Sequence, residues 1–95
     1  MSEFEIAQHV LNTLRQAESA EPQAAVPLLK KLIGLVNGDG SEQPFEIEEA
    51  RSTAFMAICE YAKALHRGQP ADELWPEAIY ATKKWQSLAG SPALA

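Results

Sequence analysis

The spacing of apolar residues along the chain limits the fold more than any other feature of the sequence. Apolar side chains recur every three to four residues over several stretches, and no segment alternates apolar and polar residues with a period of two. A period near 3.6 gathers apolar side chains on one face of an α-helix, whereas a half-buried strand requires a period of two. The pattern therefore predicts an all-α protein.

Proline and glycine residues divide this pattern into four helical segments within one domain, residues 1–95. Ser2 and Glu5 have the spacing of a capping box at the start of the first segment, and Gly68 follows the end of the third. We expect the helices at about residues 3–19, 23–36, 46–67 and 73–89.

Short connections between helices favour antiparallel neighbours, so the sequence predicts a four-helix up-down bundle or a related antiparallel helical array. The second helix has the widest apolar arc, and we expect it to be the most buried, with Leu32 near the centre of the core. Its first residue is left open, because proline is tolerated in the first turn of a helix and both Pro22 and Pro27 fit there.

The composition is that of a small, acidic, globular protein. Of the 95 residues, 46% are hydrophobic and 22% are charged, and the formal net charge is −5. Acidic residues in the first turns of the expected helices, among them Glu3, Glu5, Glu46 and Glu48, offset the helix dipoles and account for much of this charge. No predominantly basic face is expected, which disfavours nucleic-acid binding.

A cytoplasmic location is expected from two features. Cys59 is the single cysteine, so no internal disulfide can form, which suits a reducing compartment. No apolar run reaches the roughly 20 residues needed to span a membrane, and the first residues lack the basic and apolar regions of a secretory signal. A membrane is therefore not expected as a partner.

The sequence contains no recognisable nucleotide, haem, zinc or nucleophile motif. The segment 37–48 has oxygen-bearing side chains at alternate positions, as calcium loops do, but Glu42 stands where such a loop requires glycine. Cys59, Lys63 and His66 share one side of the third helix, and a nearby cation lowers the pKa of a thiol, but no carboxylate or amide is placed to orient the histidine. We expect no enzyme activity, no cofactor and no metal.

Two residues fit the polar faces of their helices poorly. Met56 lies on the polar side of the third helix beside Phe55 and Cys59, and Tyr80 lies opposite the apolar stripe of the fourth helix. Clustered exposed apolar residues mark contact surfaces. The candidate interface is therefore Phe55, Met56, Cys59 and Tyr80.

These features favour a non-enzymatic protein–protein interaction module, either a homodimer or the binder of another protein, as an adaptor or immunity-type protein is. The alternative is a small-ligand-binding or regulatory bundle with an aromatic-lined pocket. The candidate pocket residues are Phe45, Tyr61, Trp75 and Trp85.

Overall fold

The computed structural model describes residues 2–36 and 43–90, and these residues form four α-helices and no strand. The helices are α1 (Glu3–Ser19), α2 (Pro22–Val36), α3 (Phe45–His66) and α4 (Leu74–Ala89). The predicted all-α class is thereby confirmed, and the predicted helix bounds lie within one residue of these. None of the described helices is long and apolar enough to cross a membrane.

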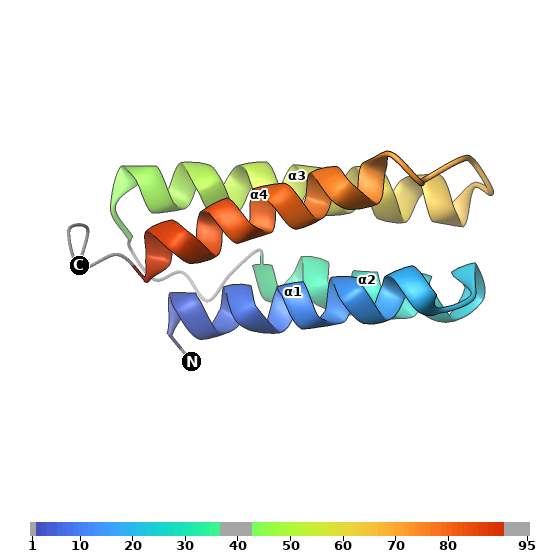
Figure 1. The fold of residues 1–95 in the computed structure, drawn as a ribbon, viewed down its shortest axis with the longest axis horizontal. Helices are drawn as coiled ribbons and strands as arrows, with labels where there is room; N and C mark the ends of the chain where they lie inside the picture. The colour runs from blue at the N-terminus through green and yellow to red at the C-terminus, as the bar shows by residue number, and fades with distance from the viewer. Residues whose placement is uncertain (1, 37–42, 91–95) are drawn as a thin grey trace.

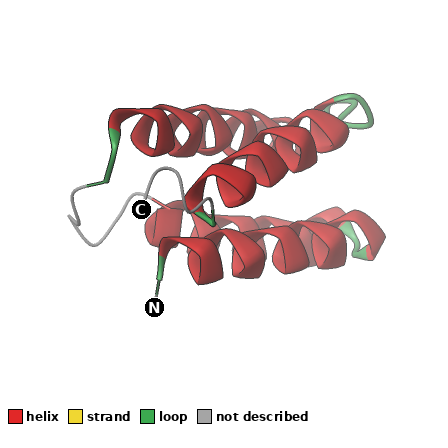
Figure 2. Cartoon of the chain, turned by 60° about the vertical axis from the view of Figure 1, so that its left-hand side comes forward, coloured by secondary structure: helices red, strands yellow, loops and turns green. Residues whose placement is uncertain are grey.

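Consecutive helices run in opposite directions and form an up-down bundle (Figure 1). α1 packs against α2 and α4, and α3 packs against the same two helices, so α1 and α3 occupy opposite corners. The α1–α2 and α3–α4 connections lie at one end of the bundle, and the first turn of α1 and the last turn of α4 lie at the other (Figures 1 and 2). The solvent-facing sides of α1 and α3 therefore point away from each other.

α1 begins at the predicted capping residue. Ser2 Oγ accepts a hydrogen bond from the backbone N–H of Glu5 at 3.1 Å, which satisfies one of the amide donors that have no partner inside the helix. The same hydroxyl donates to Glu5 Oε1 at 3.2 Å. The apolar face that follows is buried, with Val10 and Leu14 completely enclosed.

The structure settles where α2 begins. The helix starts at Pro22, and Pro27 lies inside it on the exposed side. Proline has no N–H to donate to the carbonyl four residues earlier, which here belongs to Gln23. Gln23 is also exposed, so water can hydrogen-bond that carbonyl instead.

The expectation that α2 is the most buried helix is wrong. α2 buries four residues, whereas α1 and α3 bury seven each. Each helix of this bundle packs against two others, and the two neighbours of α2 cover only the centre of its wide apolar arc. The margins of the arc therefore remain half-buried at the surface, as Val26, Leu28, Ile33 and Leu35 do. Leu32, in the middle of the arc, is only 1% exposed and does belong to the core.

α3 ends in a glycine turn that directs the chain into α4. Gly68 has a positive φ of 68°, a conformation that glycine adopts without steric cost. The Gly68 N–H donates to the Leu65 carbonyl at 3.2 Å, and the Gln69 N–H donates to the Ala64 carbonyl at 2.9 Å. These bonds satisfy carbonyls of the last turn of α3.

Candidate functional site

The four residues of the predicted interface differ in exposure. The Met56 side chain on α3 is 59% exposed and Tyr80 on α4 is 74% exposed. Phe55 and Cys59 are half-buried at the margin of the core. Met56 therefore lies outside the core of its own subunit, next to an apolar margin, as an interface residue would.

A groove of about 330 Å³ runs between the outer sides of α3 and α4. Tyr80 forms one of its walls, and Met56 follows the groove residue Thr53 by one helical turn. The groove combines alanine and leucine side chains with carboxylates and one amine. Its lining residues are Glu46, Glu49, Ala50, Thr53, Tyr80, Ala81, Lys84 and Leu88.

The exposed side of α3 is acidic at its start and basic at its end. Glu46 and Glu49 are exposed in the first turns, whereas Lys63 lies in the last turn and Arg67 follows it. Lys63 Nζ lies 3.6 Å from Glu60 Oε1, but both side chains are more than half exposed. An exposed pair of this kind contributes little energy, so Lys63 remains available to another carboxylate.

The four aromatic residues predicted to form a pocket do not share one cavity. Trp85 is fully buried, and Phe45 is 72% exposed at the start of α3. Phe45 lies sixteen positions before Tyr61 on this helix, a distance of about 24 Å at 1.5 Å per residue. The prediction of one shared pocket is therefore corrected. Of the four residues, only Tyr61 and Trp75 line a common pocket.

This pocket is a hollow of about 360 Å³ at the end of the bundle where α1 meets α2 and α3 meets α4. We call it the end hollow. Glu18 and Asp72 contribute carboxylates, and none of its described lining residues is a lysine, arginine or histidine. Its lining residues are Ala17, Glu18, Ala20, Pro22, Tyr61, Leu65, Ala71, Asp72 and Trp75.

Tyr61 and Trp75 present different groups to the end hollow. The Trp75 indole N–H donates to the Leu14 carbonyl at 2.7 Å, which fixes the half-buried ring against α1. Burial raises the pKa of the Tyr61 hydroxyl, and the negative charges of Glu18 and Asp72 raise it further. The Tyr61 hydroxyl is therefore uncharged at neutral pH.

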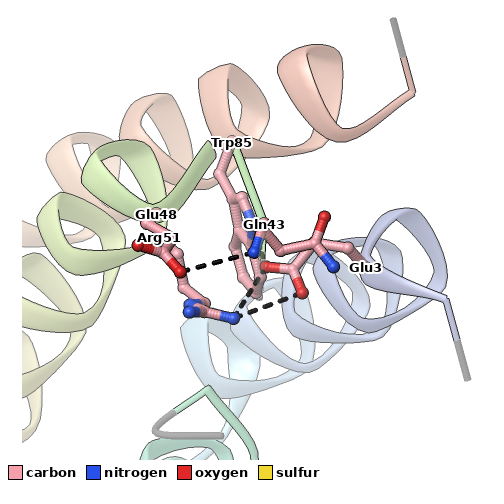
Figure 3. A network of polar contacts seen from close by, with 5 residues as sticks. All are labelled: Glu3, Gln43, Glu48, Arg51 and Trp85. Carbon is pink, nitrogen blue, oxygen red and sulfur yellow. Dashed lines mark hydrogen bonds and ion pairs between the residues drawn. The ribbon is translucent and has the colours of Figure 1, made fainter. Parts of the chain in front are cut away.

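A network at the opposite end of the bundle was not predicted from the sequence (Figure 3). Glu3 Oε2 on α1 accepts hydrogen bonds from the Trp85 indole N–H at 2.9 Å and from Arg51 NH1 at 3.2 Å. The Glu3 side chain is 7% exposed and that of Arg51 is 21% exposed. Three helices meet at one carboxylate, and the role that this geometry supports is structural.

A second hydrogen bond in the same view holds the entry to α3. The Gln43 backbone N–H donates to Glu48 Oε1 at 3.4 Å (Figure 3). Pro44 occupies the capping position and makes no side-chain hydrogen bond there. The Glu48 carboxylate instead accepts a hydrogen bond from the residue just before Pro44. Glu48 thereby connects the start of α3 to the residue that precedes Pro44.

Cys59 does not have the environment of a reactive thiol. Desolvation raises its pKa, the charge of Glu60 raises it further, and Lys63 only partly opposes these effects. The cation-activated arrangement of Cys59 with Lys63 is therefore not what the structure forms.

We expect Cys59 to react with a thiol-specific reagent more slowly at neutral pH than an unstructured cysteine does. The raised pKa leaves a smaller fraction of thiolate, which is the reacting form. The labelling rate should rise tenfold per pH unit and level off only above the usual thiol pKa. Stopped-flow labelling between pH 7 and 10 checks this, with urea-unfolded protein as the reference. Faster labelling of the folded protein at neutral pH would contradict it.

No group of three or more histidine, cysteine, aspartate or glutamate side chains is positioned to hold a metal ion among residues 2–36 and 43–90. Asn37, Asp39 and Ser41, part of the segment compared with calcium loops, lie outside the described residues. A comparison of the chain with protein-family models, curated proteins and solved structures gives no match. The class that the fold defines is a small four-helix bundle, and its function has to be inferred from the two surfaces described above.

Proposed function

We propose that this protein is a non-enzymatic, cytoplasmic protein–protein interaction module that works as a homodimer through the outer side of α3. The observation that carries the proposal is the exposure of Met56 on α3 and Tyr80 on α4, at 59% and 74%, near the groove between the two helices, which Tyr80 lines. Exposed apolar residues that are grouped in this way characterise contact surfaces. The single, half-buried cysteine supports the reducing location.

The charge distribution along α3 supports a second copy of the chain as the partner. Met56 is the twelfth of the 22 residues of α3 and so lies close to its midpoint. A two-fold axis near Met56 would set two α3 helices antiparallel, as the self-complementary contact of a symmetric dimer requires. Glu49 of each copy would then face the basic end of α3 in the other, near Lys63.

Such a contact is small, and its affinity should be modest. Its apolar area comes from exposed Met56 and Tyr80 and from half-buried Phe55 and Cys59. The remaining contacts are between charged side chains. Contacts of less than 1,200 Å² belong to weak or transient complexes, so we expect a dissociation constant of about 1 μM to 1 mM.

Replacement of Met56 by glutamate should weaken the dimer by about tenfold or more, because the interface would bury an unpaired charge. The free energy of unfolding of the monomer should change little, since the side chain is exposed. Sedimentation equilibrium measures the dissociation constant, and a urea melt measures the stability.

Asn12→Glu is the matched control for this variant. Asn12 is exposed on α1, at the opposite corner of the bundle, and the substitution adds the same charge there. Association of the Asn12→Glu variant should equal that of the unmodified protein. If Met56→Glu and Asn12→Glu associate equally well, the outer side of α3 is not the contact surface.

A further inference from the structure

The end hollow brings two carboxylates together from separate parts of the chain. Glu18 comes from the last turn of α1, and Asp72 comes from the turn that precedes α4. No basic side chain is among the described residues that line the hollow, and both carboxylates act on the same hydroxyl, that of Tyr61. Both carboxylates are exposed, and together they give the hollow a negative charge that attracts cations.

Tyr61 supplies an independent sign that a ligand belongs there. The residue is only 4% exposed, yet its hydroxyl has no hydrogen-bond partner among the described residues. The oxygen is not fully enclosed either, because no enclosed side-chain oxygen or nitrogen of the described residues lacks a partner. The hydroxyl of this buried ring therefore opens into the hollow, where it is positioned to hydrogen-bond a ligand that displaces water.

The remaining wall of the hollow suits an alkyl chain next to the charge. Leu65 provides aliphatic surface, and the Trp75 ring is held in place by its hydrogen bond to the Leu14 carbonyl. An indole attracts cations through the face of its ring and attracts alkyl groups through apolar contact. The volume of about 360 Å³ lies near the lower limit of small-molecule pockets.

We propose that the end hollow binds a small molecule with a primary alkylammonium group. Glu18 and Asp72 neutralise the ammonium charge, the Tyr61 hydroxyl accepts one of its N–H bonds, and Trp75 with Leu65 contacts the alkyl chain. A quaternary ammonium ion has no N–H to donate to this hydroxyl, so it fits the hollow less well. The hollow is separate from the outer side of α3, so this site does not depend on the proposed dimer.

The test is a titration with n-butylammonium chloride monitored by tryptophan fluorescence. Trp85 is fully buried at the other end of the bundle, so a change of emission reports Trp75. We expect saturable binding with a dissociation constant of about 1–10 mM, as befits a ligand of five heavy atoms. n-Butyltrimethylammonium should bind more weakly, and the neutral analogue butan-1-ol should give no saturable change.

Three variants examine the named groups. Tyr61→Phe keeps the ring and should weaken binding about two- to tenfold, the contribution of one hydrogen bond. The double variant Glu18→Gln, Asp72→Asn should abolish saturable binding, whereas Glu73→Gln, beside Asp72 but outside the hollow, should leave it unchanged. Circular dichroism establishes that each variant is folded.

Several results would overturn the site. These are no saturable response to n-butylammonium, an equal response to butan-1-ol, or unchanged binding by the folded double variant. Nα-acetyl-lysine amide imitates a lysine side chain within a protein, so comparing it with n-butylammonium distinguishes a protein ligand from a small free amine. Tighter binding of this compound than of n-butylammonium would assign the hollow to a protein partner and overturn the small-molecule proposal.

Discussion

Replacement of Trp85 by alanine is expected to lower the free energy of unfolding by about 3–5 kcal/mol. Trp85 is the largest fully buried side chain of the described residues, and its removal leaves a cavity that the surrounding helices can fill only in part. The substitution also removes the hydrogen bond that joins α4 to Glu3 of α1. Urea unfolding followed by circular dichroism at 222 nm measures the loss, because helix content reports unfolding without the tryptophan.

Trp85→Phe separates the two contributions. Phenylalanine retains much of the buried ring but cannot donate to Glu3, so the expected loss is smaller, about 1–3 kcal/mol. A domain of this size has a total stability of about 5–15 kcal/mol, so the alanine variant can be largely unfolded while the phenylalanine variant stays folded. If the free energy of unfolding falls less in Trp85→Ala than in Trp85→Phe, Trp85 does not have the buried, hydrogen-bonded position described here.

Replacement of Leu32 by alanine is expected to cost about 2–5 kcal/mol, as truncation of a buried leucine does. Leu32 is 1% exposed on the inner side of α2. Leu28→Ala is the matched control, because Leu28 lies one turn earlier on the same helix but is only half-buried. Urea melts should show the larger loss for Leu32, and equal losses would mean that the two positions do not differ in burial.

The fold could be predicted from the sequence because its determinants are local. The period of the apolar residues gives the helices, Ser2 marks the start of α1, and Gly68 marks the end of α3. What the period does not give is how much of an apolar arc the neighbouring helices cover. The wide apolar arc of α2 predicts a deeply buried helix, whereas its two neighbours cover only the centre of the arc.

The candidate site was only partly predictable, for two different reasons. The Glu3–Arg51–Trp85 network joins residues 48 and 82 positions apart, and no local pattern connects them. The sequence does give one signal, since a buried indole N–H requires an acceptor. The sequence also gives a signal for Phe45, because this residue precedes Ile47 by two positions and so lies on the other side of α3, which is exposed.

The exposed position of Met56, in contrast, followed directly from its place on the polar side of α3. The structure shows this residue 59% exposed beside half-buried Phe55 and Cys59. That a partner covers it remains our proposal.

The antiparallel contact between two α3 helices is tested most directly with two charge-reversal variants, Glu49→Lys and Lys63→Glu. In a symmetric dimer each variant alone would set like charges opposite each other, and at low salt this should weaken association about tenfold. In a mixed dimer the lysine at 49 faces the glutamate at 63 of the other copy, and the original Glu49–Lys63 pair forms as well. The account therefore predicts that light scattering, at one total protein concentration, gives an average mass closer to the 10.4 kDa of the monomer for each variant alone and a clearly higher mass, toward twice that value, for the equimolar mixture. A mixture that scatters as the average of its two components would contradict it.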